Sequence, residues 1–317
     1  MTPQTLLVPL DGSTAAMRAL PIAEAVARAT GATLRLLAVA EPLAEAERDR
    51  TSEIRACLAM SALEALERQL HVHARVLQER GVMTAVLMAT GDPVAAILAA
   101  AAAPDVSAVV MAPREINGGA PQRSVTEAVL RAAIRPVLLA PAPDALASTP
   151  ARLRTLLLTL DGSAAAEAAL PVAAGLAVAA RARLLLVRVQ QWRTTTLKTY
   201  PPTPASDEIQ RRLENAALGY LRAIRARLPE PLSVELRVLG GVAADELVRL
   251  ARHQAADLLV MATHGSGGRR ATLGGTAAGV IDAGLPTLLV PPEPWPSPAT
   301  DGVRASGAVE NTSHGTG

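Results

Sequence analysis

The chain has 317 residues, 50% of them hydrophobic, and a formal net charge of +2, which is enough apolar material for two packed domains. Its basic residues are scattered, and it contains two Trp, two Tyr and no Phe, so it has neither the charge footprint nor the stacking platforms of a nucleic-acid binder. No apolar stretch approaches the roughly 20 residues that span a bilayer, and the amino terminus lacks a secretory pattern. We therefore expect a cytoplasmic protein that binds neither nucleic acid nor membrane.

The chain contains two copies of one pattern. Residues 6–27 (LLVPLDGSTAAMRALPIAEAVA) align without a gap with residues 156–177 (LLLTLDGSAAAEAALPVAAGLA), at an offset of 150 residues. An internal duplication of this length predicts two domains of the same fold. We place them at residues 1–143 and 151–293. The remaining segment, 294–317, lacks apolar periodicity, which is typical of a disordered tail.

Within each copy, short Val- and Leu-rich runs alternate with longer Ala-rich helical patterns. This alternation predicts βαβ units around a parallel sheet that is buried on both faces. In the second copy we expect strands near 154–160, 183–189, 233–238, 257–262 and 287–291, and helices near 163–180, 206–228, 242–255 and 275–284. Ser13 and Ser163 stand where a strand turns into a helix, and each is a good N-cap.

In a doubly wound sheet, ligands bind beyond the carboxyl ends of the strands, where the winding reverses. In the second copy, Asp161 follows the first strand, and the glycine-rich segment THGSGGRRATLGGT, residues 263–276, follows the fourth. Such a segment can present backbone amides to an anion, and the helix that begins near Gly275 adds its partial positive charge. On its own, Asp161 is equally consistent with a helix cap or a turn residue.

The strand followed by Asp-Gly-Ser, together with the late pattern A-x2-G-x9-G-T, resembles the universal stress protein family in its tandem two-domain form. The resemblance implies an α/β fold with two doubly wound, five-stranded parallel sheets, each in the order 3-2-1-4-5 of the adenine nucleotide alpha hydrolase-like fold. It also implies an intrachain pseudo-dimer that meets through the last strands, near 137–141 and 287–291. A further homodimer stays open.

The resemblance further implies a site for ATP, with or without Mg, or for a related adenine nucleotide. By position, Thr159 and Asp161 after the first strand and Val189 at the end of the second would surround the adenosine. Met261 would lie under the same pocket.

The phosphates are expected at the late pattern, which reads G-x2-G-x9-G-[ST] in ATP-binding members of the family. Here the matching residues are Ala262, Gly265, Gly275 and Thr276, so alanine replaces the first glycine. The two glycines would allow close backbone approach, and Thr276 would donate through its hydroxyl and amide.

The first copy departs from this pattern. It retains Asp11 but has Ala112, Glu115, Val125 and Thr126 at the four positions of the late pattern. A carboxylate at 115 would repel phosphate, and a side chain at 125 removes backbone clearance. We therefore expect the first site to be weak or empty, and one nucleotide to bind per chain.

The sequence contains no G-x4-G-K-[ST], G-x-S-x-G, C-x2-C or H-E-x2-H pattern, so we assign no catalytic residue and no metal site. We expect a non-enzymatic, ATP-binding stress-response module whose occupancy alters binding to an unknown protein partner. One alternative is a slow ATPase or nucleotidyl transferase in the same pocket, with Asp161 and His264 as the available bases. The other is an interaction scaffold that binds no nucleotide.

Overall fold

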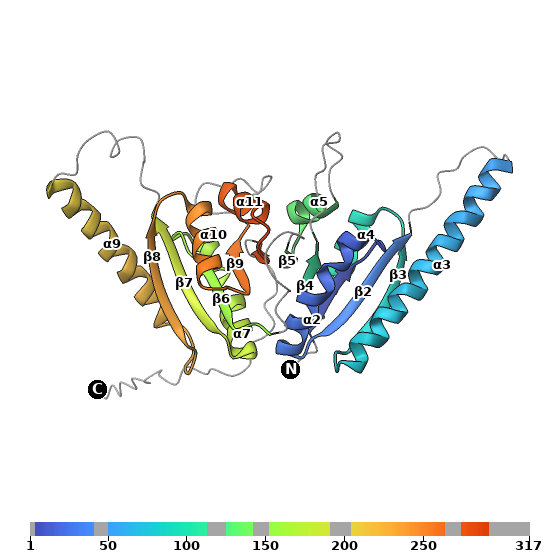
Figure 1. Ribbon diagram of the computed structural model, residues 1–317, viewed down its shortest axis with the longest axis horizontal. Helices are drawn as coiled ribbons and strands as arrows, with labels where there is room; N and C mark the ends of the chain where they lie inside the picture. The colour runs from blue at the N-terminus through green and yellow to red at the C-terminus, as the bar shows by residue number, and fades with distance from the viewer. Residues whose placement is uncertain are drawn as a thin grey trace, which may run out of the picture.

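The Val- and Leu-rich runs form the ten strands of one continuous sheet (Figure 1). The computed structural model describes residues 4–40, 50–112, 125–141, 152–190, 204–263 and 274–291. The strand order is β3-β2-β1-β4-β5-β10-β9-β6-β7-β8, so each half has the order 3-2-1-4-5. The predicted α/β fold class is therefore confirmed, with the two five-stranded sheets merged into one mixed sheet.

The strands are β1 (Thr5–Pro9), β2 (Thr33–Ala40), β3 (Thr84–Thr90), β4 (Val106–Met111) and β5 (Val137–Leu139) in the first half, and β6 (Thr155–Thr159), β7 (Arg183–Gln190), β8 (Val234–Gly240), β9 (Leu258–Ala262) and β10 (Thr287–Val290) in the second. The helices of the first half are α1 (Thr14–Met17), α2 (Ala19–Thr30), α3 (Arg50–Glu79), α4 (Pro93–Ala101) and α5 (Val125–Ala132). Those of the second half are α6 (Ala164–Glu167), α7 (Leu170–Ala180), α9 (Pro204–Arg225), α10 (Ala243–His253) and α11 (Gly275–Asp282).

One predicted helix is divided in the structure. The single helix expected over 163–180 forms as α6 and α7, and Pro171 stands in the first turn of α7. Proline has no backbone N–H, and its ring clashes with the carbonyl of the residue four positions earlier, which here is Glu167 at the end of α6. The apolar pattern continues across this break, which is why periodicity alone predicted one helix.

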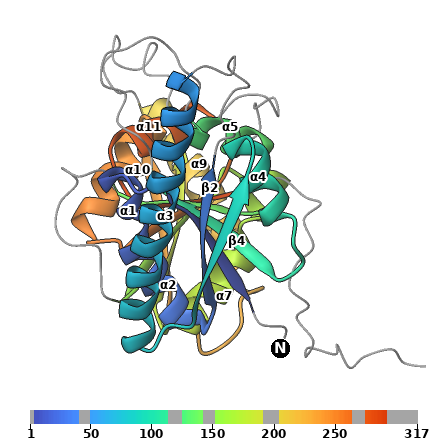
Figure 2. The ribbon, with the colours of Figure 1, turned by 90° about the vertical axis from the view of Figure 1, so that its right-hand side faces the viewer.

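Helices cover both faces of the sheet (Figure 2). One buried cluster joins the sheet to α2, α3, α7 and α9, and a second joins it to α4, α5, α10 and α11. Strand alternation sorts the side chains: Leu184 and Leu186 belong to the first cluster, and Leu185 and Val187 to the second. Because both faces are covered, central strands such as β6 and β9 read as continuous apolar runs. Among the described residues, no helix is both long and apolar enough to cross a membrane.

The two halves meet at the centre of the sheet. Strands β5 and β10 pair antiparallel, with Leu138 opposite Leu288, Val137 opposite Leu289 and Leu139 opposite Thr287. Since residues 150 apart are equivalent, the pair of Leu138 and Leu288 lies on an approximate twofold axis. Helices α2 and α7 pack against each other beside this pair. The expected intrachain pairing through the last strands is confirmed.

We predict an acid-sensitive contribution to stability from Asp105, which precedes β4. Its carboxylate accepts hydrogen bonds from Arg35 at 2.7 Å and from the Thr5 hydroxyl at 2.9 Å. Partial burial by itself would raise the pKa of Asp105, but these two bonds and the charge of Arg35 hold it below its usual 3.8. A lowered folded pKa stabilises the protein above the unfolded value, and that stabilisation is lost as pH falls through the folded pKa.

The Asp105→Asn variant should therefore unfold more easily at pH 7, by about 1 kcal/mol, the scale of a partly exposed ion pair. At pH 3 the difference from the parent should shrink. Urea unfolding at both pH values measures it, and Arg35→Met should show the same trend. An equal difference at the two pH values would contradict the prediction.

Candidate functional site

The residues expected at the adenosine side meet at one edge of the second half. Thr159 ends β6, Val189 is the second-last residue of β7, and Met261 is the second-last of β9. Strands β7 and β9 both pair parallel with β6, and Thr159 of β6 is in register with Val187 of β7. Val189 and Met261 both contact the buried cluster under α10 and α11. The structure therefore brings these side chains to the carboxyl edge, on the face that α11 covers.

Asp161 shapes the turn that follows β6. Its Oδ1 accepts hydrogen bonds from the Ser163 N–H at 2.8 Å and from the Ser163 hydroxyl at 2.6 Å. The Ser163 Oγ in turn accepts from the Ala166 N–H at 3.1 Å, as an N-cap of α6. The prediction that Ser163 is an N-cap is confirmed, and Asp161 is the turn residue beside it. A role for Asp161 in ligand binding stays a prediction.

The phosphate side begins where α11 starts. Gly274 is the N-cap, and its N–H donates to the Thr263 carbonyl at 3.2 Å, so the start of α11 is bound to the residue that follows β9. Gly275 is exposed at the first position of the helix, and Thr276 follows it, half-buried. A Cβ at Gly275 would meet no described atom within 4 Å. Among the described residues, nothing blocks a close approach to the backbone at this helix start.

The other two residues expected on the phosphate side are Ala262 and Gly265. Ala262 is the last residue of β9 and is buried. Gly265 belongs to segment 264–273, which lies outside the described residues, as does His264.

Helix α11 packs tightly on α10. A Cβ at Gly279 would lie 2.7 Å from the Cβ of Ala244, closer than two such atoms approach, so only glycine permits this separation. The equivalent position of the first half is Val129, which is fully buried. Nothing in the periodicity of α11 pointed to this contact, because the partner comes from another helix.

The equivalent edge of the first half has the same turn but carries Val125 in place of Gly275. Asp11 forms the same turn, accepting from the Ser13 N–H at 2.9 Å, and Ser13 caps α1 as predicted. At the start of α5, however, Val125 packs against the buried cluster. The Thr126 hydroxyl faces the Ala112 carbonyl at 3.5 Å. Glu115 lies outside the described residues.

A polar network that the sequence did not indicate lies beside the second turn. The Tyr220 hydroxyl of α9 donates to Glu167 Oε1 at 3.1 Å, and Arg227 donates to Glu167 Oε2 at 2.6 Å. Burial raises the pKa of Tyr220, and the hydrogen bond to Glu167 raises it further. The phenol therefore remains a protonated donor at neutral pH. Its signal in the sequence was weak, since α9 reads as an ordinary amphipathic helix.

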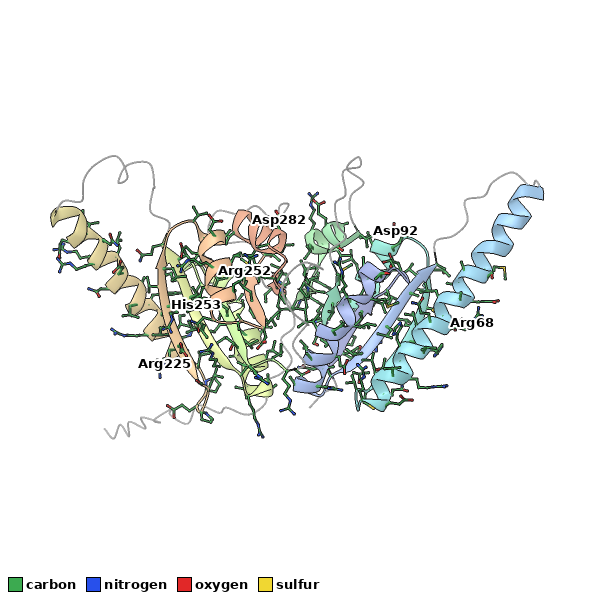
Figure 3. The ribbon with its side chains drawn as sticks, in the orientation of Figure 1. Arg68, Asp92, Arg225, Arg252, His253 and Asp282 are labelled. Atoms are coloured by element: carbon green, nitrogen blue, oxygen red, sulfur yellow. The ribbon has the colours of Figure 1, made fainter. Side chains whose placement is uncertain are left out.

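The basic side chains in the last turns of α9 and α10 lie away from this edge. Arg225 ends α9, and Arg252 and His253 end α10 (Figure 3). Both helices run back from the carboxyl to the amino ends of the strands, so these charges complement helix dipoles there. Among the described residues, no group of three or more His, Cys, Asp or Glu side chains is placed to hold a metal ion.

The model of the universal stress protein family matches residues 3–141 and again residues 152–291. The chain belongs to the universal stress protein family. It carries two Usp domains in tandem, and each match spans one half of the ten-stranded sheet. The resemblance in the two Asp-Gly-Ser turns and the late glycine pattern is thereby confirmed at the level of the family.

Solved structures show the same tandem fold. A universal stress protein from Archaeoglobus fulgidus is 19% identical, with 91% of this chain and 96% of that chain covered and a TM-score of 0.63. A protein assigned to the same family from Pseudomonas aeruginosa is 20% identical over 92% and 94%, with a TM-score of 0.61. A universal stress protein solved in complex with cAMP matches 44% of this chain, at 26% identity and a TM-score of 0.31. No curated protein matches the chain.

Proposed function

We propose that the second Usp domain binds ATP, with or without Mg, or a related adenine nucleotide. One observation supports the proposal: α11 begins with Gly275 and Thr276 after the carboxyl end of β9, and no described atom lies within 4 Å of a Cβ at Gly275. A triphosphate needs several donors with little side-chain bulk around them, and a helix start of this kind supplies both. Membership of the family supports the same ligand.

We further propose a regulatory module rather than an enzyme. On this hypothesis, nucleotide occupancy of the second domain changes binding to a protein partner in the cytoplasm, during a stress response. The Asp161 carboxylate accepts two hydrogen bonds from Ser163, which suits a turn that presents a fixed acceptor better than a group that must exchange protons. The first domain would contribute the paired sheet and no nucleotide.

Two assays separate this function from its alternatives. Equilibrium dialysis with labelled ATP should give one bound nucleotide per chain, and no binding would favour an interaction scaffold. Product ADP should then stay near background over hours with the saturated protein. Steady ADP formation would favour a slow ATPase, and two comparable sites would mean that the first domain also binds.

Asp161→Ala should weaken ATP binding by about 1–3 kcal/mol, the usual scale for a hydrogen bond to a charged group. Asp161→Asn keeps an acceptor for the Ser163 turn and removes only the charge, so its loss should be smaller. Titration calorimetry measures both variants. The matched control is Asp11→Ala, which breaks the same turn in the first domain and should leave affinity unchanged. Equal losses from Asp11→Ala and Asp161→Ala would contradict the assignment to the second domain.

A further inference from the structure

A guanidinium group lies against the turn that carries Asp161. Gly162, at the centre of the turn, has a φ of +89°. A Cβ at this position would lie 3.2 Å from both Nη1 and Nη2 of Arg188, a residue of β7. The Cζ of Arg188 is also 4.9 Å from the ring centroid of Tyr220, within the range of a cation–π contact. Arg188 therefore contacts both the turn and α9.

This contact is tied into the hydrogen-bonded network around Glu167. Glu167 ends α6, the short helix that begins directly after the turn. Its carboxylate accepts one hydrogen bond from the Tyr220 hydroxyl and one from Arg227, which lies beyond the end of α9. The bond to Tyr220 fixes the position of the tyrosine ring. The turn before α6 thus lies against Arg188, and the last residue of α6 is hydrogen-bonded to the tyrosine that Arg188 contacts. Together these contacts restrain the turn and α6 against β7 and α9.

The first domain seats the same turn differently. Gly12 has a φ of +80°, and a Cβ there would lie 3.0 Å from Cδ1 of Leu66 on α3. The position equivalent to Arg188 is Ala38, which is fully buried. In the half that has lost the glycine pattern, the nearest atom to the turn is thus the aliphatic Leu66 Cδ1, with Gln69 Oε1 3.6 Å from the same Cβ position. In the half that retains the pattern, the nearest group is the charged guanidinium of Arg188.

We propose that Arg188, held on the Tyr220 ring, is a positioning residue for the nucleotide site of the second domain. It fixes the Asp161 turn before the ligand arrives, so that the carboxylate needs no ordering on binding. Strand alternation puts Arg188 on the face of Leu186, whereas Val189 and Met261 face the α11 side. Arg188 thus acts on the turn from behind and does not contact the nucleotide.

The inference rests on the proposed function, so its test has two independent readouts. The first is amide hydrogen exchange in the absence of nucleotide, at Ser163 and Ala166, whose N–H groups the turn and the cap bind. In Arg188→Ala, exchange at these amides should be at least about tenfold faster, because a local restraint on opening is removed. The second is ATP affinity by calorimetry, which should fall by about tenfold from loss of a preorganising cation–π contact.

Two further variants and one control sharpen the test. Arg188→Lys retains a charge over the ring but lacks the planar group, so it should rescue part of the affinity. Tyr220→Phe retains the ring and removes the hydrogen bond to Glu167. It should weaken ATP binding by about threefold at most. Arg183→Ala is the matched control, since Arg183 lies in the same strand and pairs with Glu235 at the opposite end. It should leave Ser163 exchange and ATP affinity unchanged.

Each outcome decides a separate point. If Arg188→Ala leaves exchange at Ser163 as in the parent, the positioning role is wrong, whatever happens to ATP. If Arg183→Ala accelerates exchange equally, Arg188 contributes only general stability and the inference fails. If Arg188→Ala accelerates exchange at Ser163 but the parent protein binds no ATP, Arg188 does restrain the turn. The proposed nucleotide function is then wrong.

Discussion

Gly275→Val is expected to lower the ATP affinity of the second domain by at least about 100-fold, which corresponds to about 2.7 kcal/mol. The protein should remain folded, because no described atom lies within 4 Å of the Cβ position. Valine already occupies the equivalent position, Val125, at the start of α5. The loss would therefore come from the bulk placed where the phosphates must approach the helix amides.

Titration calorimetry gives affinity and stoichiometry in one experiment, and thermal unfolding without nucleotide checks the fold. The matched control is Gly175→Val on α7, an exposed helical glycine whose Cβ would also meet no described atom within 4 Å. It should leave the affinity unchanged and should not lower helix stability, because valine has a higher helix propensity than glycine. Unchanged binding in Gly275→Val would place the pocket elsewhere. Two comparable sites in the parent would show that Val125 and Glu115 do not close the first domain.

Leu138→Asp should lower the free energy of unfolding by about 4 kcal/mol or more, since it buries an unpaired carboxylate. Leu138 is 2% exposed and stands opposite Leu288 at the junction of the two half-sheets. The substitution keeps the backbone pairing of β5 and β10 but removes the apolar contact between the domains. Loss of this contact should also separate the unfolding of the two domains.

Urea unfolding followed by circular dichroism measures the free energy of unfolding and shows whether the two domains unfold in one transition or two. The control is Val178→Asp on α7. Val178 is 51% exposed, so the same charge remains hydrated there and should cost less than about 1 kcal/mol. A mild effect of Leu138→Asp, equal to that of Val178→Asp, would show that the domains do not depend on the junction. A single cooperative transition in Leu138→Asp would show that they remain coupled through other contacts, such as that of α2 with α7.

Local pattern was sufficient for most elements of the fold. Each strand predicted in the second copy forms. The central ones are apolar because both faces are buried, whereas β8, at the edge of the sheet, includes Glu235 and Arg237. The caps at Ser13 and Ser163 form because a hydroxyl at a strand-to-helix turn satisfies an exposed N–H. The helix predicted over 163–180 was wrong in its continuity, since Pro171 interrupts hydrogen bonding while the apolar pattern continues.

The sequence predicted which edge of the sheet the candidate residues occupy, but not the packing around them. The carboxyl edge was predictable, because parallel strands that share a direction end on the same side and the glycine pattern follows the fourth strand. The packing behind it was not. Gly279 reads as an ordinary helix residue until Ala244 is brought to its side, and Arg188 reads as a surface charge until Gly162 lies over it.

The duplication, the βαβ order and the position of the Asp-Gly-Ser turns could all be found without coordinates, because they depend on periodicity and on residues that are close in the chain. The antiparallel pairing of β5 with β10 depends on the folded chain, and so do the contacts of Arg188 with the second turn and of Leu66 with the first. Such contacts join residues that are distant in sequence. Their separation is set by how the helices cross the twisted sheet, and a pattern of neighbouring residues carries no measure of that distance.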